Sequence, residues 1–297
     1  MGLLEAHAGL AGKVAVVVGG ASGFIGRAVT LELAKAGVTI AACDNDEPAV
    51  DAIKAEVEAL GGKILSLYAD VVDPASLDAF YDRVGREFAS VDILVNVPGG
   101  VRRSPFLEAT REDDARDIRL NYGYVVDSVR HAVPLMRRGG RGGSIINFTT
   151  IEAHRGAATY AVYAGAKAAT TNFSRAIAVE LGGDEIRVNL IAPDTSPARA
   201  SNSALYPADF ERLAALGSDA LDQAYKMYVP LKRAPTVEDL TNGVLFLASD
   251  LSRSITGTTL HIDGGTIAAL GFIDWPHGDS FMPAPLGGSL GRLFPKD

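Results

Sequence analysis

Short apolar runs alternate with longer amphipathic segments along most of the chain. Runs rich in Val, Ile and Ala predict buried strands at 13–18, 38–43, 64–69, 91–95, 144–148, 186–191 and 258–262. Apolar residues at helical spacing predict helices at 26–37, 46–60, 73–88, 110–136, 159–181 and 237–248. Strands that alternate with helices are typical of a parallel sheet. We therefore expect an α/β fold: a Rossmann-like, doubly wound, seven-stranded parallel sheet with helices on both faces.

Two helix starts carry recognisable capping signals. Asp73 precedes Pro74, which places an N-cap residue before a proline in the first helical turn. Thr110 and Asp113 have the spacing of a capping box, with Asp in place of the usual Glu.

No linker or low-complexity tract divides the chain. We expect one domain over residues 1–270, followed by a C-terminal extension over 271–297 that is rich in glycine and proline. The segment 194–231 is predicted to be a long, partly helical insertion between a strand and a helix.

Composition and charge exclude several classes of partner. The 297 residues carry a net charge of −8, which argues against a nucleic-acid partner, and there is no polybasic stretch for a membrane surface. The single cysteine, Cys43, allows no internal disulfide. The first residues lack a secretory signal, and no apolar run is long enough to span a bilayer. We expect a soluble cytoplasmic protein.

A glycine-rich turn joins the first strand to the first helix, in the segment Gly19-Gly-Ala-Ser-Gly-Phe-Ile-Gly26. Glycines in this place let backbone amides approach a pyrophosphate, and the helix N-terminus adds a favourable dipole. The alternative is a tight turn that needs glycine only for steric reasons.

Asp44 ends the second strand, where a carboxylate suits a ribose 2′-hydroxyl and repels a 2′-phosphate. This favours NAD over NADP. The alternative is a helix cap, because Asp44, Asn45 and Asp46 all precede a helix.

Tyr163 and Lys167 are four residues apart in a predicted helix, so they share a face. A phenol beside an ammonium is an acid/base whose pKa is expected to be lowered towards neutrality. The same spacing also arises by chance in helices, with the tyrosine half in the core and the lysine in solvent.

Several motifs occur together in a fixed order. Besides the glycine turn and the Tyr-Lys pair, these are Asp70-Val71, Asn96-Val-Pro-Gly99, Asn121, Thr150, Arg187-Val-Asn-Leu-Ile-Ala-Pro193 and Ile262-Asp-Gly-Gly265. In this combination the chain resembles the short-chain dehydrogenase/reductase family, in its compact single-domain branch, over about residues 12–265.

The resemblance implies roles for specific residues. The implied catalytic set is Asn121, Thr150, Tyr163 and Lys167. The implied cofactor-binding residues are Gly19, Ser22, Gly23, Phe24, Ile25, Gly26, Asp44, Asp70, Val71, Asn96, Gly99, Tyr163, Lys167, Pro193 and Thr195. The cofactor is expected to be NAD rather than NADP, and no metal site is expected.

The chain departs from the family pattern at four places. Phe24 lengthens the glycine turn, Pro98 removes an amide donor, Thr150 replaces serine, and Asp194 replaces a glycine. Counted from Gly20, the turn has the spacing of the extended branch, which includes epimerases and dehydratases of nucleotide sugars.

The expected activity is the NAD-dependent interconversion of a secondary alcohol and a ketone. Aromatic and apolar residues over 195–231 favour a lipophilic substrate, including cyclic or steroid-like ones, although ordinary helix packing would also use them. A 3-oxoacyl thioester reductase is the enzymatic alternative, and a non-catalytic dinucleotide-binding sensor is the alternative of another class. The resemblance further implies a homotetramer or homodimer.

Overall fold

The computed structural model describes residues 8–194, 217–275 and 281–283, and within them the predicted sheet is present. Its seven strands are all parallel and lie in the order β3-β2-β1-β4-β5-β6-β7. They span Val14–Val18 (β1), Thr39–Asp44 (β2), Ile64–Tyr68 (β3), Ile93–Asn96 (β4), Gly143–Phe148 (β5), Ile186–Pro193 (β6) and Thr259–Ile262 (β7). The Rossmann-like, doubly wound fold is thereby confirmed.

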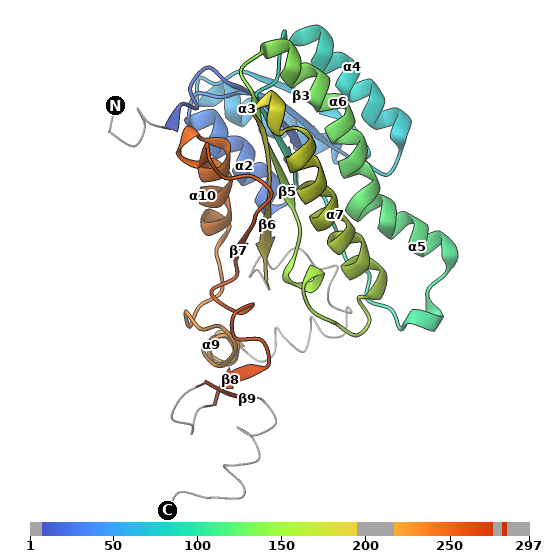
Figure 1. Ribbon diagram of the computed structural model, residues 1–297, viewed down its shortest axis with the longest axis vertical. Helices are drawn as coiled ribbons and strands as arrows, with labels where there is room; N and C mark the ends of the chain where they lie inside the picture. The colour runs from blue at the N-terminus through green and yellow to red at the C-terminus, as the bar shows by residue number, and fades with distance from the viewer. Residues whose placement is uncertain (1–7, 195–216, 276–280, 284–297) are drawn as a thin grey trace, which may run out of the picture.

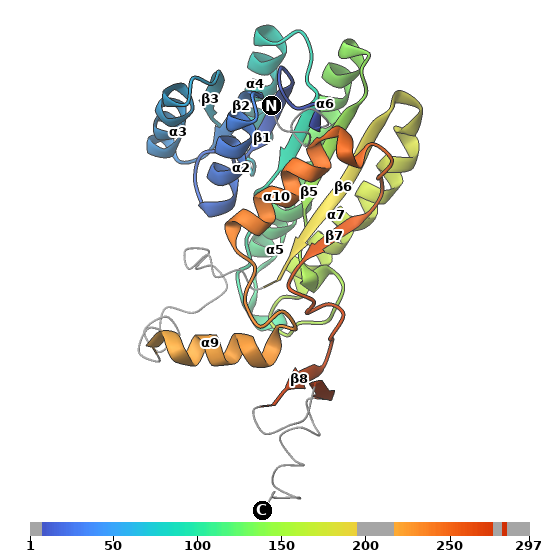
Figure 2. The same ribbon diagram turned by 90° about the vertical axis from the view of Figure 1, so that its left-hand side faces the viewer.

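Helices cover both faces of this sheet (Figures 1 and 2). One face carries α2 (Phe24–Lys35), α3 (Glu47–Ala59) and α10 (Val237–Ala248). The other carries α4 (Pro74–Glu87), α5 (Arg111–Ile118), α6 (Tyr124–Gly139) and α7 (Ala161–Glu180).

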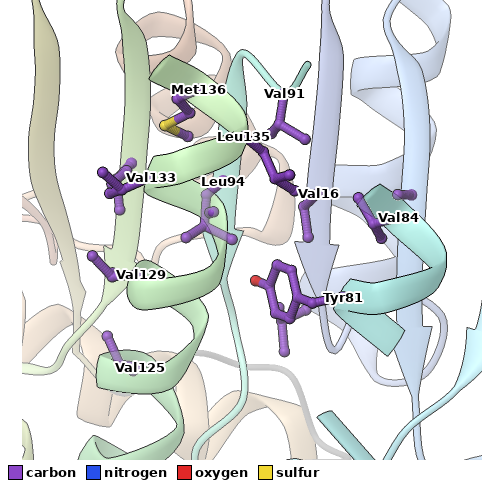
Figure 3. Packing of buried hydrophobic residues seen from close by; sticks show 14 of the residues in the cluster. Val16, Tyr81, Val84, Val91, Leu94, Val125, Val129, Val133, Leu135 and Met136 are labelled. Atoms are coloured by element: carbon purple, nitrogen blue, oxygen red, sulfur yellow. The ribbon is translucent and has the colours of Figure 1, made fainter. Parts of the chain in front are cut away.

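Alternate residues of each strand enter opposite cores, because successive side chains of a strand point to opposite faces. In β1, Val16 and Val18 pack with α4 and α6, whereas Ala15 and Val17 pack with α2 and α10. Figure 3 shows the first of these cores, where Tyr81 lies between the helices and the central strands. Burial on both faces explains why the central strands are continuous apolar runs in the sequence.

The helix predicted over 110–136 is interrupted by a π-helical turn, η2 (Arg119–Gly123), between α5 and α6. The capping box at its start is present, since Thr110 and Asp113 each bond the backbone of the other. A single π turn is a short interruption of one residue, and a helix predicted from apolar spacing over 110–136 does not show it. The turn contains Asn121.

The order of the strands reverses direction between β1 and β4, and ligands of open α/β sheets bind at such a point, beyond the carboxyl ends of the strands. Past the carboxyl ends of β6 and β7 lie α9 (Gly217–Tyr228) and a hairpin of β8 (Phe272–Asp274) and β9 (Phe281–Pro283), as Figures 1 and 2 show. The fold thus brings the glycine turn, the helix α7 and the helix α9 to one end of the sheet.

Candidate active site

The glycine turn follows β1 and needs glycine at specific positions. Gly19 and Gly23 have φ values of 69° and 65°, which side chains rarely adopt. A Cβ on Gly26 would lie 1.8 Å from the carbonyl oxygen of Gly19, so the first turn of α2 can approach the end of β1 only with glycine there. Nothing lies within 4 Å of the place where a Gly23 Cβ would stand, which leaves this part of the turn open to a ligand.

Asp44 holds this turn in place. Its Oδ2 accepts hydrogen bonds from the backbone amides of Ala21 (3.2 Å) and Ser22 (2.8 Å), and its Oδ1 accepts from the Ser22 hydroxyl (2.7 Å). The helix-cap alternative belongs to Asp46, which accepts from the amide of Ala49 and caps α3. A carboxylate can accept about four hydrogen bonds, so Asp44 keeps capacity for a further donor.

A cavity of about 370 Å³ opens beside the turn, between the carboxyl ends of β1 and β4. The predicted cofactor residues that line it are Gly19, Ser22, Gly23, Phe24, Ile25, Gly26, Asp44, Asp70, Val71 and Gly99. Lining residues that the sequence did not single out as cofactor-binding are Asn45, Ala69, Val72, Val97, Pro98, Arg116 and Leu120. Most of these neighbour a predicted residue, whereas Arg116 belongs to α5 and is brought in by the fold.

Four of the predicted cofactor residues that the structure describes do not line this cavity: Tyr163 and Lys167, which lie on α7, and Asn96 and Pro193. The Asn96 side chain is fully buried and donates to Asn147 Oδ1 at 2.8 Å, so it joins β4 to β5 inside the sheet. Pro193 lies at the end of β6. Thr195 falls outside the described residues.

The predicted catalytic residues come from three different elements. Thr150 follows β5 and is hydrogen-bonded to Tyr163, while Tyr163 and Lys167 lie one turn apart on α7. Asn121 comes from the π turn. The fold therefore brings the hydroxyl, the phenol and the ammonium to the same end of the sheet.

Lys167 is held in a dry environment. Its Nζ donates to the backbone oxygens of Phe148 (3.0 Å) and Pro98 (3.5 Å), and the residue is 3% exposed. Burial lowers the pKa of Lys167 to about 8, because the charged form loses hydration that two carbonyls replace only in part.

The pKa of Tyr163 differs from the expectation. Burial raises it above the ordinary value, and the hydrogen bond with Thr150 offsets only part of that rise. The expected lowering is therefore wrong for the protein alone, because desolvation of the phenolate outweighs the neighbouring groups. As it stands, Tyr163 is a proton donor at neutral pH.

Asn121 is fixed by its side chain and by its main chain. Its Nδ2 donates to the carbonyls of Gly100 and Asp117, both at 2.9 Å, and its Oδ1 accepts from the Gly100 amide at 3.1 Å. Its own carbonyl accepts from the Thr170 hydroxyl at 2.8 Å. A Cβ on Gly99 would meet both Lys167 Nζ at 2.6 Å and Asn121 Oδ1 at 3.0 Å, which places Gly99 between the two.

Charged side chains adjoin this set, and sequence reasoning gave them no role. Glu152, in the short helix η3 (Ile151–Ala153), accepts a hydrogen bond from the Thr150 hydroxyl and pairs with Arg155 at 2.7 Å. Asp194 also pairs with Arg155, at 3.4 Å. Only the substitution of a family glycine by Asp194 signalled this group in the sequence.

Neither a metal-binding cluster nor a membrane-spanning helix occurs in the described part of the chain. No group of three or more His, Cys, Asp or Glu side chains in the described part of the chain could hold a metal ion. A larger cavity of about 580 Å³ lies beside β7 and the start of α10, and it contains none of the predicted site residues. None of the helices described here is both long and apolar enough to cross a membrane.

Comparison with known proteins identifies the family. A family model described as enoyl-(acyl carrier protein) reductase matches residues 19–266. The chain is 31% identical to a 3-oxoacyl-[acyl-carrier-protein] reductase of Thermotoga maritima, over 87% of this chain and 99% of the relative. It is 33% identical to an L-rhamnose 1-dehydrogenase (NAD(P)(+)) of Azotobacter vinelandii, over 86% and 97%.

A solved structure agrees with these relatives. The 7α-hydroxysteroid dehydrogenase complexed with NADH and 7-oxo glycochenodeoxycholic acid superposes with a TM-score of 0.79 at 28% identity, covering 89% of this chain and 98% of that one. The ordered motifs, the parallel sheet and these similarities lead to one conclusion. The chain belongs to the short-chain dehydrogenase/reductase family and is an NAD(P)-dependent alcohol dehydrogenase or ketoreductase.

Proposed function

We propose that the protein interconverts a secondary alcohol and a ketone with NAD as cofactor, and that Tyr163 is the general acid/base. The observation that carries this proposal is the grouping of Tyr163, Thr150 and Lys167, with Tyr163 hydrogen-bonded to Thr150 and Lys167 buried one helical turn away. Such a group can give a proton to a carbonyl oxygen, or take one from an alcohol.

The cavity beside the glycine turn fits a dinucleotide. Glycines with positive φ leave the turn open at Gly23, and the N-terminus of α2 points at the same place, which suits a pyrophosphate. Asp70 and Val71 would flank the adenine end, and Gly99 lies towards Lys167. The bound cofactor would supply or accept the hydride.

Asp44 supports NAD over NADP. Asp44 is 5% exposed and its carboxylate accepts from three donors of the turn, so it stays in place at the cavity wall. A ribose 2′-hydroxyl can donate to it, whereas a 2′-phosphate would be repelled.

Each catalytic residue then has a distinct task. Tyr163 moves the proton at its phenolic oxygen, and Thr150 orients that oxygen. Lys167, protonated at neutral pH with its pKa of about 8, favours the phenolate in the oxidative direction. Asn121 holds the backbone around Gly100 and, through a water molecule, would connect Lys167 to solvent.

For the substrate we propose a lipophilic alcohol or ketone, including cyclic or steroid-like compounds. The similarity to a hydroxysteroid dehydrogenase supports this class. Tyr225 and Met227 of α9 are partly buried, and this helix adjoins the site through the hydrogen bond of Tyr228 with Asp194. The sequence suggested this class from aromatic and apolar residues over 195–231, of which those over 195–216 lie outside the described part of the chain.

One alternative has a specific observation in its favour. The reductase of Thermotoga maritima and the matching family model both concern acyl-carrier-protein substrates, so a 3-oxoacyl thioester is the second candidate. A panel of secondary alcohols, ketones and 3-oxoacyl thioesters, each assayed with NAD(H) and NADP(H), separates the two. Turnover of thioesters alone, with NADPH, would refute the first proposal.

Tyr163→Phe tests the mechanism. The variant should lose turnover of every substrate of the panel while binding NADH with nearly unchanged affinity in a fluorescence titration. Normal turnover by this variant would exclude Tyr163 as the acid/base. Binding of cofactor by the wild type, with no turnover in the whole panel, would favour a sensor.

We also propose assembly as a homotetramer or homodimer through α5 and α7. These helices pack together and expose apolar side chains, including Ile118 (47% exposed) and Val179 (85% exposed). Light scattering after size exclusion tests this directly, and a monomer at assay concentration would contradict it.

A further inference from the structure

A compact group of charged and hydroxyl side chains borders the catalytic tyrosine. Glu152 and Arg155 follow the catalytic Thr150, Asp194 follows β6, and Tyr228 is the last residue of α9. The side chains of Glu152 and Asp194 are only 15% and 3% exposed. Two carboxylates and one guanidinium are thus largely removed from water at this end of the sheet.

Arg155 connects the members of this group. Its Nη2 donates to Glu152 Oε1 (2.7 Å) and Asp194 Oδ1 (3.4 Å), and its Nη1 donates to the Tyr228 hydroxyl (2.5 Å). Tyr228 in turn donates to Asp194 Oδ2 at 2.8 Å. These contacts fix the orientation of the Glu152 carboxylate, because one of its oxygens is held by Arg155 and the other is directed at Thr150.

The Thr150 hydroxyl has a single proton, and it is given to Glu152 Oε2. With that proton on Glu152, the Thr150 oxygen can only accept from its neighbour Tyr163, so the protonated phenol is the donor in this arrangement. A phenolate at Tyr163 would need the same Thr150 proton, so Glu152 and the phenolate compete for it.

We propose that Glu152 is a positioning residue of the reaction: it accepts the Thr150 proton and, with its charge, keeps Tyr163 in the protonated form that donates to a carbonyl. This inference rests on the proposed role of Tyr163 as the general acid/base. Arg155, Asp194 and Tyr228 keep Glu152 in this arrangement and tie it to α9.

Other groups also act on Tyr163 and set the background. On α7, the Tyr160 ring lies 6.2 Å from the Tyr163 ring, and Lys167 follows one turn later with its Nζ on the carbonyls of Phe148 and Pro98. The Glu152–Arg155–Asp194 group lies on the η3 and β6 side. Burial raises the pKa of Tyr163 most, donation of the Thr150 proton to the phenolate would lower it, and the Glu152 charge raises it. The sign agrees with the competition deduced from the contacts.

The test is a titration of Tyr163 with and without Glu152. The absorbance of tyrosinate is measured against pH in the presence of saturating NAD or NADP, whichever binds. The same titration of each protein with Tyr163→Phe added is subtracted, so that the difference reports Tyr163 alone. Glu152→Gln should lower the midpoint by about 1 pH unit, because the charge is lost but an acceptor remains. Glu152→Ala should lower it further, because Thr150 can then donate to the phenolate.

A double variant separates the two effects. In a Thr150→Ala background, Glu152→Ala should shift the midpoint only as much as Glu152→Gln does in the wild type, since only the charge remains to be removed. Glu180→Gln is the matched control. It removes the same charge at the far end of α7, about 25 Å from Tyr163, and should leave the titration of Tyr163 unchanged.

An unchanged midpoint in folded Glu152→Gln would overturn the proposal, and so would an equal shift in Glu180→Gln. If Glu152→Ala does not fold, the near-isosteric Glu152→Gln decides alone. The titration does not require turnover, so its result is independent of the substrate panel. If the Tyr163 midpoint shifts as expected but the protein oxidises no alcohol, the role of Glu152 stands and the proposed substrate class is refuted.

Discussion

Lys167 should make the protein less stable at neutral pH than a methionine in its place. The Lys167 ammonium is buried and has two backbone carbonyls as partners, and its pKa falls from 10.5 to about 8. Methionine has a similar length and no charge, so Lys167→Met removes the buried charge with little change in packing. Turnover should be lost in the same variant.

The magnitude follows from linkage between protonation and folding. Below about pH 8 the lysine is charged in both states, and the folded state bears the full cost of burial. Between about 8 and 10.5 the unfolded chain binds more protons, so wild-type stability rises with pH. The fall of the Lys167 pKa from 10.5 to about 8 corresponds to about 3 kcal/mol of folding free energy.

The assay is urea unfolding of both proteins at a series of pH values, from about pH 7 to about pH 10. Lys167→Met also removes the hydrogen bond to the Phe148 carbonyl, which changes the free energy of unfolding by the same amount at every pH. The difference in unfolding free energy between the two proteins must therefore be compared across the pH range. The advantage of Lys167→Met should shrink by about 3 kcal/mol as the pH rises. A difference that stays flat would refute the low pKa and, with it, the dry environment of Lys167.

Three further predictions concern the glycines and Asp44. Gly26→Ala should abolish NADH binding in a fluorescence titration, because its Cβ would lie 1.8 Å from the carbonyl oxygen of Gly19. Its control is Gly165→Ala, at a glycine of α7 with open space around it, which should raise the free energy of unfolding by about 0.5–1 kcal/mol in urea. Gly99→Ala should reduce kcat at least tenfold, because its Cβ would displace the Lys167 Nζ from its carbonyl partners; a kcat equal to wild type contradicts this. Asp44→Asn should weaken NADH binding and lower the melting temperature without gaining NADPH affinity, because the same side chain anchors the glycine turn; a clean switch to NADPH would show that the anchoring is dispensable.

The contrast between Asp44 and Asn96 shows where sequence patterns mislead. Both stand at the end of a strand in family motifs, and both were assigned to the cofactor. Asp44 does line the cavity, although its carboxylate also holds the glycine turn, whereas Asn96 points into the sheet and bonds Asn147. A motif fixes the location of a residue along a strand, but the side chain follows whichever face the local register presents.

The sequence by itself determined the sheet and its helices and predicted the catalytic set, because these depend on local signals: apolar runs, caps, glycines and residues at fixed spacing. Only the tertiary structure decided the protonation of the site. The pKa values of Tyr163 and Lys167 follow from burial, which no local pattern measures. The contact of Glu152 and Arg155 with Asp194 likewise joins the end of β5 to the end of β6, and such a pairing exists only once parallel strands are placed side by side.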